Sequence, residues 1–564
     1  EDIRLATLSA NIQGALKAQA SGKISLPLDS IRRNGSVNLK VETGNLAFVE
    51  TMMEGIVLPH GMKLNGEARI NGSKLGADLQ FLPGRKANVS VKADYDMQKE
   101  AYLFDLNVDS LNLHRFMPHD SIFGLSATIH AEGEGMDFFS PRTRAMLKTE
   151  VSHFRYGSLV FSGVTLTAGL QRSQASALLN INNRALDVSA ELQALLHPNL
   201  VKADLNTSIR LLDWQELALM NTPFRSSMNI EVHAQTDMKQ RHSARTTISG
   251  IQLATAERTF KTKDLHAGFN MAPDSVRGYV NAGDLTFLFR TANSLEKFMN
   301  KTDRIAQEFS AQWKKKHINQ QLLKEIMPTA QLKIFSGSDN PVANFLAAQH
   351  ISYNRLKANF SMSPEQGLDG SIDLFGLHTD SLQLDTIYFR ASQDSARLQF
   401  NSGVKALASK RQEAFNISLN GYIGSTDAQM LIGYLNGKGE TGVDLGLQAQ
   451  LRPNGISMHI TPDNPTLVYR PFKVNPDNYI YLSDQGRIHA DVKIYDENHS
   501  GLSLYSTPDS LAQQDITLGL NQINIAEFRR IIPYMPDIAG FINAEAHYIQ
   551  TEASTQVAID ISLH

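Results

Sequence analysis

The sequence predicts a mainly β protein: an elongated, curled, mostly antiparallel sheet with short amphipathic helices and one long helix near 293–327. Three observations predict this fold class. Apolar and polar residues alternate along most of the chain, turn residues separate the alternating runs, and a single long stretch has helical periodicity. Alternation gives each strand one apolar and one polar face, which suits an antiparallel sheet wetted on one side.

Alternating runs begin near the N-terminus and continue to residue 192. Examples are Ile24/Leu26/Leu28, Val37/Leu39/Val41, Leu75/Ala77/Leu79/Phe81, Phe104/Leu106/Val108, Val164/Leu166/Ala168/Leu170 and Leu186/Val188/Ala190/Leu192. Asn-Gly pairs such as Asn71-Gly72, Asn436-Gly437 and Asn454-Gly455 stand between runs, where they favour hairpin turns. These signals predict neighbouring strands that pair in chain order.

The stretch from 293 to 327 is predicted to be a helix. Asn293 and Glu296 have the spacing of a capping pair, and Pro328 would stop the helix. Its apolar stripe includes Phe298, Ile305, Phe309 and Trp313, and an amphipathic helix must bury such a stripe. We expect the helix to cover part of the groove, with Phe309 and Trp313 turned inward. The alternative is a helix lying on a membrane surface, where Lys314-Lys315-Lys316 would meet anionic headgroups.

A weak internal repeat is visible. Its unit is a strand, a polar step, a short apolar-faced helix, a loop and a second strand. It occurs at 103–133, 203–234 and 516–549, more loosely at 37–70, and at 284–299 with the short helix grown into the long one. We therefore predict a continuous array divided into an N-terminal segment (1–290), a helical insertion (291–350) and a C-terminal segment (351–564).

Composition limits the functional classes. The 564 residues carry a net charge of −3, so electrostatics gives no reason to expect nucleic acid, and the absence of cysteine excludes thiol chemistry. No run is apolar and long enough to cross a bilayer. The chain begins within one alternating pattern and ends within another, and we expect it to be a fragment of a longer protein.

No constellation of residues indicates catalysis, a cofactor or a metal, so we expect a non-enzymatic protein. Gly437, Gly439 and Gly442 spell G-x-G-x-x-G, but a strand-like run follows them where a dinucleotide site needs a helix. His114 and His119 lack a third ligand at metal spacing and are interpreted as surface residues. Trp214 is interpreted as a core residue.

The most distinctive segments are TPDNPTLVYRPFKVNPDNYIYLSDQGRIHADVKIYDENHSGLSLYSTP (461–508) and INIAEFRRIIPYMPDIAGFINAEAHY (523–548). Together they resemble the TamB/AsmA-like envelope protein family, most closely its TamB-type proteins of the Bacteroides group. The resemblance implies a repeating β-groove, or β-taco, in the periplasm. Its apolar interior would carry phospholipid acyl chains between the inner and outer membranes. It also implies an outer-membrane β-barrel partner, a link to outer-membrane assembly, and an inner-membrane anchor missing from this chain.

On this interpretation the alternating apolar residues line a lipid groove. The predicted lining is Phe415, Ile417, Leu419, Val443, Leu445, Leu447, Ile488, Val492, Ile516, Leu518, Val557 and Ile559. Two other functional classes stay open. A structural or adhesive array that binds protein or glycan predicts a closed core and exposed aromatic patches. An enzyme on a β-helix scaffold predicts carboxylates clustered on one face, which the sequence does not display.

Overall fold

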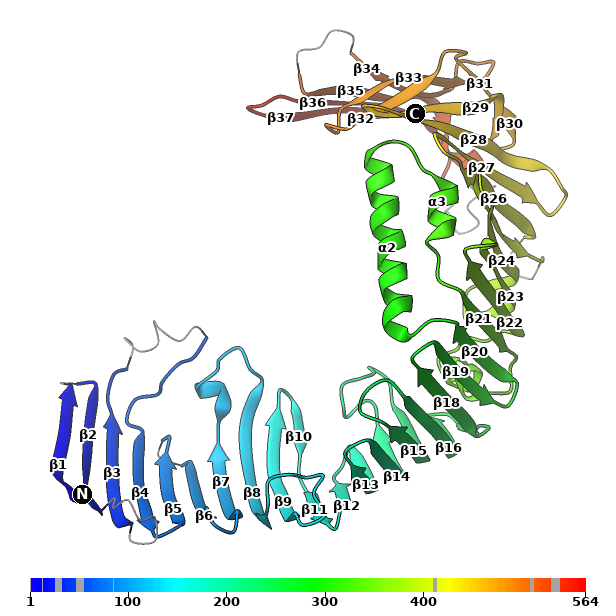
Figure 1. Ribbon diagram of the computed structural model, residues 1–564. Helices are drawn as coiled ribbons and strands as arrows, with labels where there is room; N and C mark the ends of the chain where they lie inside the picture. The colour runs from blue at the N-terminus through cyan, green and yellow to red at the C-terminus, as the bar shows by residue number, and fades with distance from the viewer. Residues whose placement is uncertain are drawn as a thin grey trace. The chain divides into compact units, whose positions relative to one another are not determined.

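The computed structural model describes residues 2–12, 14–25, 33–46, 55–84, 86–408, 413–507, 512–528 and 538–564. Within these ranges 37 strands join one open antiparallel sheet, which confirms the predicted fold class. The chain divides into two compact units, unit 1 (1–270) and unit 2 (271–564). Figure 1 labels most of the strands of both units and the helices α2 and α3.

Unit 1 consists of strands that pair with their neighbours in chain order, except that β9 pairs with β8, β10 and β11 and that β16 pairs with β15, β17 and β18. Strand β18 (Leu265–Ala272) contains the boundary with unit 2. The strands before it are β1 (Asp2–Ile12), β2 (Leu16–Ser25), β3 (Asn34–Thr43), β4 (Lys63–Asn71), β5 (Lys74–Leu82), β6 (Asn88–Asp96), β7 (Ala101–Leu111), β8 (Ile122–Glu134), β9 (Arg144–Tyr156), β10 (Leu159–Phe161), β11 (Val164–Gln171), β12 (Gln174–Asn182), β13 (Leu186–His197), β14 (Leu200–Asp213), β15 (Phe224–Thr236), β16 (His242–Thr255) and β17 (Thr259–Lys261).

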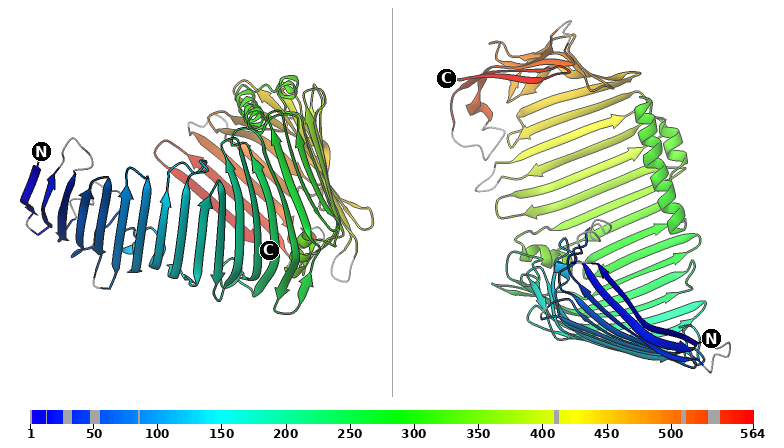
Figure 2. Two further views of the ribbon diagram at one scale, coloured as in Figure 1. Left: turned by 60° about the horizontal axis from the view of Figure 1, so that its bottom comes forward. Right: turned by 90° about the vertical axis from the view of Figure 1, so that its left-hand side faces the viewer.

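Unit 2 continues the same plan, with β29 pairing with β28, β30 and β32. Its strands are β19 (Ser275–Ala282), β20 (Leu285–Thr291), β21 (Ala330–Ser336), β22 (Arg355–Ser363), β23 (Gly367–His378), β24 (Gln383–Gln393), β25 (Leu398–Ala406), β26 (Phe415–Ile423), β27 (Asp427–Asn436), β28 (Thr441–Arg452), β29 (Gly455–Leu467), β30 (Arg470–Pro471), β31 (Lys473–Val474), β32 (Tyr479–Ser483), β33 (Ile488–Tyr495), β34 (Gly501–Ser506), β35 (Gln514–Asn524), β36 (Phe541–Gln550) and β37 (Thr555–Leu563). Figure 2 shows successive strands of each unit lying side by side.

The predicted helix 293–327 is two helices, α2 (Leu295–Lys314) and α3 (Gln320–Glu325). The predicted cap is also shifted. Ser294 caps α2 by accepting a hydrogen bond from the Lys297 amide at 3.2 Å, whereas Asn293 donates to Thr291. The helical segment lies within unit 2, together with α4 (Pro341–Ala348), which falls inside the predicted helical insertion 291–350 but was not predicted as a separate helix.

The break between α2 and α3 has a local cause. Lys316 adopts a positive φ of 57°, which ends α2 without a glycine. The turn lets Ile318 reach the sheet, where it is fully buried against Leu323 and Leu451. Asn319 then caps α3 by accepting from the Leu322 amide at 2.9 Å. The chain therefore buries Ile318 against the sheet instead of continuing as one helix, although the helical periodicity of the sequence continues.

The repeated plan of strand, helical turn and strand is present at 103–133, 203–234 and 516–549, whereas the connection in the looser copy at 37–70 includes residues 47–54, which lie outside the described residues. The 3₁₀ helix η2 (Leu113–Arg115) lies between β7 and β8, and α5 (Ile525–Phe528) lies between β35 and β36. A turn at Trp214 to Leu219 occupies the same place between β14 and β15. Each connection stands at the end of its strands, so the helical turns border the sheet faces.

Buried apolar residues of unit 1 gather at the end of the sheet where β3, β7 and β14 stop, which we call the rim of unit 1. One cluster there contains Ala15, Leu46 and Met62, packed against Phe81 and Phe116. Farther along the same rim, Phe224 is 1% exposed. The compact packing of unit 1 thus lies at strand ends rather than along the middle of the sheet.

Candidate functional site

An unbroken row of residues crosses the middle of unit 1 on one face. Directly opposed residues of antiparallel strands project from the same face, so the pairing register defines each row. We call this set the apolar row. It runs from β3 to β12 through Leu39, Gly66, Leu79, Val91, Leu106, Ile129, Thr149, Leu166 and Leu179.

The apolar row is not covered by a second layer. Leu79 is 38% exposed, and the other leucines, valine and isoleucine of the row are only half-buried. The accessible surface of the 62.4 kDa chain is 33538 Å². Two compact domains of half this mass would together expose only about 24,000 Å². A large apolar surface without a partner in its own chain is a feature of ligand or partner sites.

In unit 2 the register places all twelve predicted lining residues on one face. The connections run through directly opposed residues: Ile417 to Tyr434 to Val443, Leu419 to Ile432 to Leu445, Leu447 to Ile460, Leu482 to Ile488, Val492 to Leu504 to Leu518, Ser506 to Ile516 to Tyr548 to Val557, and Ala546 to Ile559. The predicted face is therefore a continuous face of the folded sheet.

The twelve residues differ in what covers them. Val492 is 1% exposed and belongs to a closed cluster with Val474 and Ile494, onto which Phe472 and Leu467 pack. Val474 lies opposite Ile494 within the sheet, and the cluster that they form with Leu467 and Phe472 encloses Val492, which is a core residue there. By contrast, Ile417 and Leu518 are 37% and 41% exposed. The open surface of unit 2 lies on either side of this cluster.

The predicted covering residues of the helix fall into two groups. Phe298 is partly buried and makes an edge-to-face contact with Phe289 of β20, with ring centroids 5.5 Å apart, and Ile305 is also partly buried. Phe309 and Trp313 are 38% and 40% exposed and stack on each other instead. The expectation that both are turned inward onto the sheet is not met, because the packed side of α2 follows Phe298, Ile305 and Gln312.

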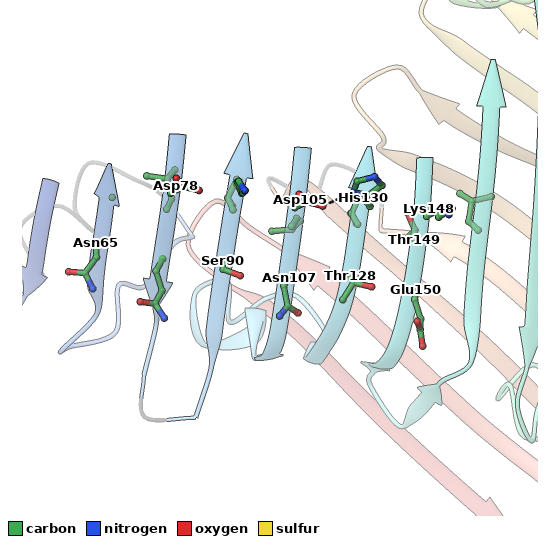
Figure 3. Close-up of a pocket in the computed structure, with 18 of the residues that line it drawn as sticks. Asn65, Asp78, Ser90, Asp105, Asn107, Thr128, His130, Lys148, Thr149 and Glu150 are labelled. Carbon is green, nitrogen blue, oxygen red and sulfur yellow. Dashed lines mark hydrogen bonds and ion pairs between the residues drawn. The ribbon is translucent and has the colours of Figure 1, made fainter. Parts of the chain in front are cut away.

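The opposite face of unit 1 is polar. Figure 3 shows its side chains in two rows across the strands, one with Asp78, Asp105, His130 and Lys148 and the other with Asn65, Ser90, Asn107, Thr128 and Glu150. An open groove of ≈ 800 Å³ runs along β3 to β9 and β11 beside these rows. His130 contacts Asp105 at 2.6 Å, but both are well exposed, so such pairs add little stability. We interpret this face as solvated.

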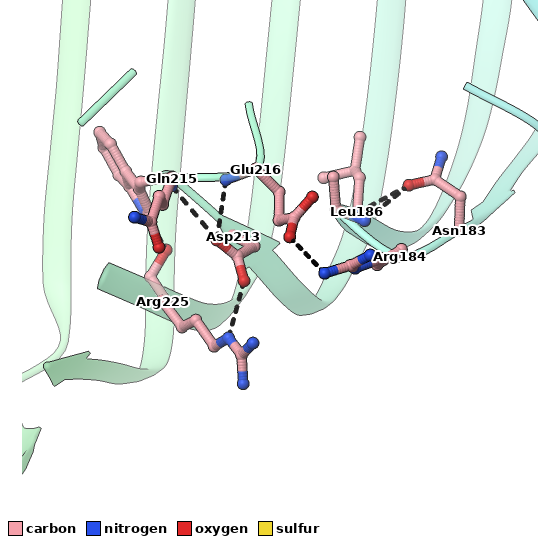
Figure 4. A network of polar contacts seen from close by, with 10 residues as sticks. Asn183, Arg184, Leu186, Asp213, Gln215, Glu216 and Arg225 are labelled. Carbon is pink, nitrogen blue, oxygen red and sulfur yellow. Dashed lines mark hydrogen bonds and ion pairs between the residues drawn. The ribbon is translucent and has the colours of Figure 1, made fainter. Parts of the chain in front are cut away.

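A buried carboxylate fixes the connection between β14 and β15. Asp213 accepts hydrogen bonds from the amides of Gln215 and Glu216 at 3.2 and 3.1 Å and from Arg225 Nε at 2.8 Å (Figure 4). Burial alone would raise the pKa of Asp213, but these donors outweigh it and hold the pKa below its ordinary value. Its role is structural, because it holds the turn that packs Trp214 on Phe224 at the rim.

The remaining candidate motifs have structural roles. Strand β28 follows Gly437 and Gly439, as the hairpin interpretation predicts, and His114 contacts the Asp120 carbonyl at 2.6 Å. Trp214, interpreted from the sequence as a core residue, is partly buried and donates to Ser226 Oγ at 2.9 Å. Among the described residues, no group of His, Asp or Glu could hold a metal ion, and no helix is long and apolar enough to span a membrane.

Comparison of the chain with protein-family models, curated proteins and solved structures gives no match. The apolar face is therefore the feature from which a function must be argued.

Proposed function

We propose that the protein binds the acyl chains of phospholipids along the open apolar face of its sheet and carries them through the cell envelope. The single observation that carries the proposal is the continuous apolar row of unit 1, which is half-exposed along its length. An acyl chain is long, flexible and uniformly apolar. It matches a row that consists of leucine, valine and isoleucine apart from Gly66 and Thr149 and that contains no charged group.

The energetics are adequate for reversible binding. Complete burial of one methylene contributes about 0.8 kcal/mol, so a chain that buries half of its surface against one wall gains about 0.4 kcal/mol per methylene. An acyl chain of about fourteen methylenes would gain about 6 kcal/mol before losses of entropy. Because the contact has no direction, neighbouring positions along the row have similar energies. These similar energies favour an acyl chain that slides along the row rather than one held tightly at a single position.

The wider role in the proposal comes from the resemblance to TamB/AsmA-like proteins. On that basis the chain would act in the periplasm, between an inner-membrane anchor and an outer-membrane β-barrel partner, as part of outer-membrane biogenesis. The open antiparallel sheet supports this reading, since such a groove needs an uncovered apolar wall. The proposal requires no enzymatic activity and no cofactor.

The alternative is an interaction array that binds protein or glycan around a closed core. It requires the middle of the apolar face to be filled by other parts of the array. Leu39, Leu106 and Ile129 are only half-buried in unit 1. Closed packing occurs instead in local clusters at the rim and around Val492. The alternative is therefore less well supported than a lipid carrier.

Photo-crosslinking tests the proposal with a matched control. A photoreactive amino acid replaces Leu106 or Ile129 on the apolar row, or Asn107 or Thr128, which are adjacent in the same strands but on the polar face. After expression in a bacterial envelope, we expect phospholipid adducts at Leu106 and Ile129 and none at Asn107 and Thr128. Equal adduct yields on both faces, or adducts to protein alone, would contradict lipid binding on this face.

Lipid extraction and mass spectrometry give the second readout. We expect the purified protein to contain phospholipid, and Leu106→Asp to reduce the bound amount because a charged side chain would interrupt the row. Asn107→Asp adds the same charge on the other face and should retain it. If folded Leu106→Asp protein kept its full lipid content, the proposal would fail.

A further inference from the structure

Helix α2 has three sides with different surroundings. The side that includes Phe298, Ile305 and Gln312, spaced by seven residues, packs onto the protein. A second side carries Met299, Phe309 and Trp313 within a sector of about 80°. The third side is polar and contains most of the basic residues. The apolar second side is exposed, and we call it the free stripe.

Both ends of α2 are fixed to the apolar side of the sheet. At the start, Phe298 contacts Phe289, which shares the face of Leu332 and Phe360. Beyond the other end, the Ile318 amide donates to the Ser425 carbonyl at 2.7 Å and Ile318 is buried against Leu451 of the same apolar face. The helix therefore stands beside that face and along its border.

An ion pair fixes the orientation of the helix about its axis. Lys316 Nζ lies 2.7 Å from Asp484 Oδ1 in the turn after β32, and the Lys316 side chain is only 10% exposed. The same ammonium lies 5.9 Å from the centre of the Trp313 ring. The helix therefore cannot bury Met299, Phe309 and Trp313 by rotating without breaking this contact and exposing Gln312, which is buried.

The free stripe is apolar and already ordered. Met299, Phe309 and Trp313 are 54%, 38% and 40% exposed, and the Phe309 and Trp313 rings stack at 6.3 Å. The hydroxyl of Thr302, which lies between them, donates to the Phe298 carbonyl at 2.9 Å. The stripe is therefore suited to an apolar partner that needs no hydrogen bond. Lys314, which is exposed, follows directly after it, whereas Lys315 projects from the polar third side.

We propose that the free stripe is a second wall of the lipid site, which holds the acyl chain of a phospholipid bound on the sheet, with the phosphate near Lys314. The inference rests on the proposed function, because it assigns a place on α2 to the same ligand. Two features favour this occupant: the stripe belongs to a helix fixed on the apolar side of the sheet, and positive charge stands at its end for a phosphate.

Trp313 provides a direct test, since the chain has only one other tryptophan, Trp214. In the Trp214→Phe variant of the full chain, Trp313 is the single fluorophore. The protein is incubated with sedimentable vesicles of phosphatidylglycerol that carries a dibrominated acyl chain, a short-range quencher. The vesicles are then removed, and the fluorescence of the supernatant is measured. We expect loss of Trp313 fluorescence relative to a sample with unbrominated lipid.

The control is Trp313→Phe, which retains Trp214. Because Trp214 packs on Phe224 at the rim of unit 1, we expect no quenching of this variant. Phe309→Asp should reduce the quenching of Trp313 by placing a charge on the stripe. Lys314→Ala should weaken uptake of phosphatidylglycerol more than uptake of a brominated fatty alcohol, which has no phosphate. Lys315→Ala, on the polar side of the helix, should not.

The outcomes separate this inference from the proposed function. Lipid adducts at Leu106 together with unquenched Trp313 in lipid-loaded protein would overturn the second wall and leave the lipid-binding sheet intact. No adducts and no extractable lipid would remove both. Sedimentation of the protein with the vesicles, with no quenching in the supernatant, would instead make α2 a membrane-surface helix and overturn the proposal.

Discussion

Replacing Leu79 by alanine tests whether the apolar face of unit 1 is open in solution. The matched variant is Leu253→Ala, because both leucines lie in strands of the same unit and the change in β propensity cancels. They differ in surroundings: Leu79 is 38% exposed in the middle of the sheet, whereas Leu253 is 5% exposed. The difference between the two variants in unfolding free energy therefore measures how far other parts of the protein cover Leu79.

The magnitudes follow from burial. Truncating leucine to alanine removes about three methylene equivalents, or about 2.4 kcal/mol when all are buried. With 38% of Leu79 already in water, the expected loss of unfolding free energy is about 1.5 kcal/mol, and no enclosed cavity forms. Leu253→Ala loses nearly the full transfer free energy plus a cavity contribution, so about 3–4 kcal/mol is expected.

Urea unfolding followed by Trp214 fluorescence measures both variants, in a Trp313→Phe background so that only unit 1 reports. We expect a lower midpoint for Leu253→Ala than for Leu79→Ala, with unchanged slopes. The two variants should differ by about 2 kcal/mol. If Leu79→Ala were as destabilising as Leu253→Ala, another layer would cover Leu79 in solution, and the reasoning from an open face would be refuted.

Three further predictions concern ionisable groups. Because the folded state lowers the pKa of Asp213, its contribution is complete above the ordinary carboxyl pKa and is lost as pH falls. Asp213→Asn should destabilise unit 1 by about 2 kcal/mol at pH 7 and converge with wild type in acid urea titrations. Burial raises the pKa of Tyr434 to about 12, so wild type but not Tyr434→Phe should lose stability as pH rises above 10, measured by calorimetry. Asp484→Asn should release Lys316 and speed hydrogen exchange in the last turn of α2, without changing exchange in β7.

Alternation made the face of the sheet predictable from sequence. Side chains of a strand alternate between the two faces with a period of two, so a correct strand assignment also assigns each residue to a face. This explains why Phe415 and Ile559, far apart in the chain, both lie on the predicted side. Exposure was not predictable in the same way. Val492 is buried because Val474, Leu467 and Phe472 from an earlier segment of the chain belong to the same cluster. Alternation within β33 does not indicate these contacts.

The helical region shows which local signals were missed. Asn340 followed by Pro341 is a good helix start, and Asn340 caps α4 by accepting from the Ala343 amide at 2.9 Å. Asn319 was a similar signal inside the predicted helix. The apolar residues keep their helical spacing across the break, although the helix does not continue there. Ile318 and Leu323 fit that spacing, but both pack against Leu451 of the sheet. Spacing alone cannot distinguish one amphipathic helix from two helices that share a partner.

The location of the buried clusters explains how the middle of the face can remain open. An apolar face without cover gains little from its own side chains, so the fold needs other sources of stability. Backbone pairing runs along every strand, and the rim clusters around Met62 and Phe224 bury side chains where the connections fold over. Because the rim supplies this packing, the apolar row does not have to be filled to hold unit 1 together. Substitutions at the rim should therefore reduce stability first, and substitutions in the row should reduce ligand binding first. A fold that closed over Leu79 and Leu106 would lose this separation.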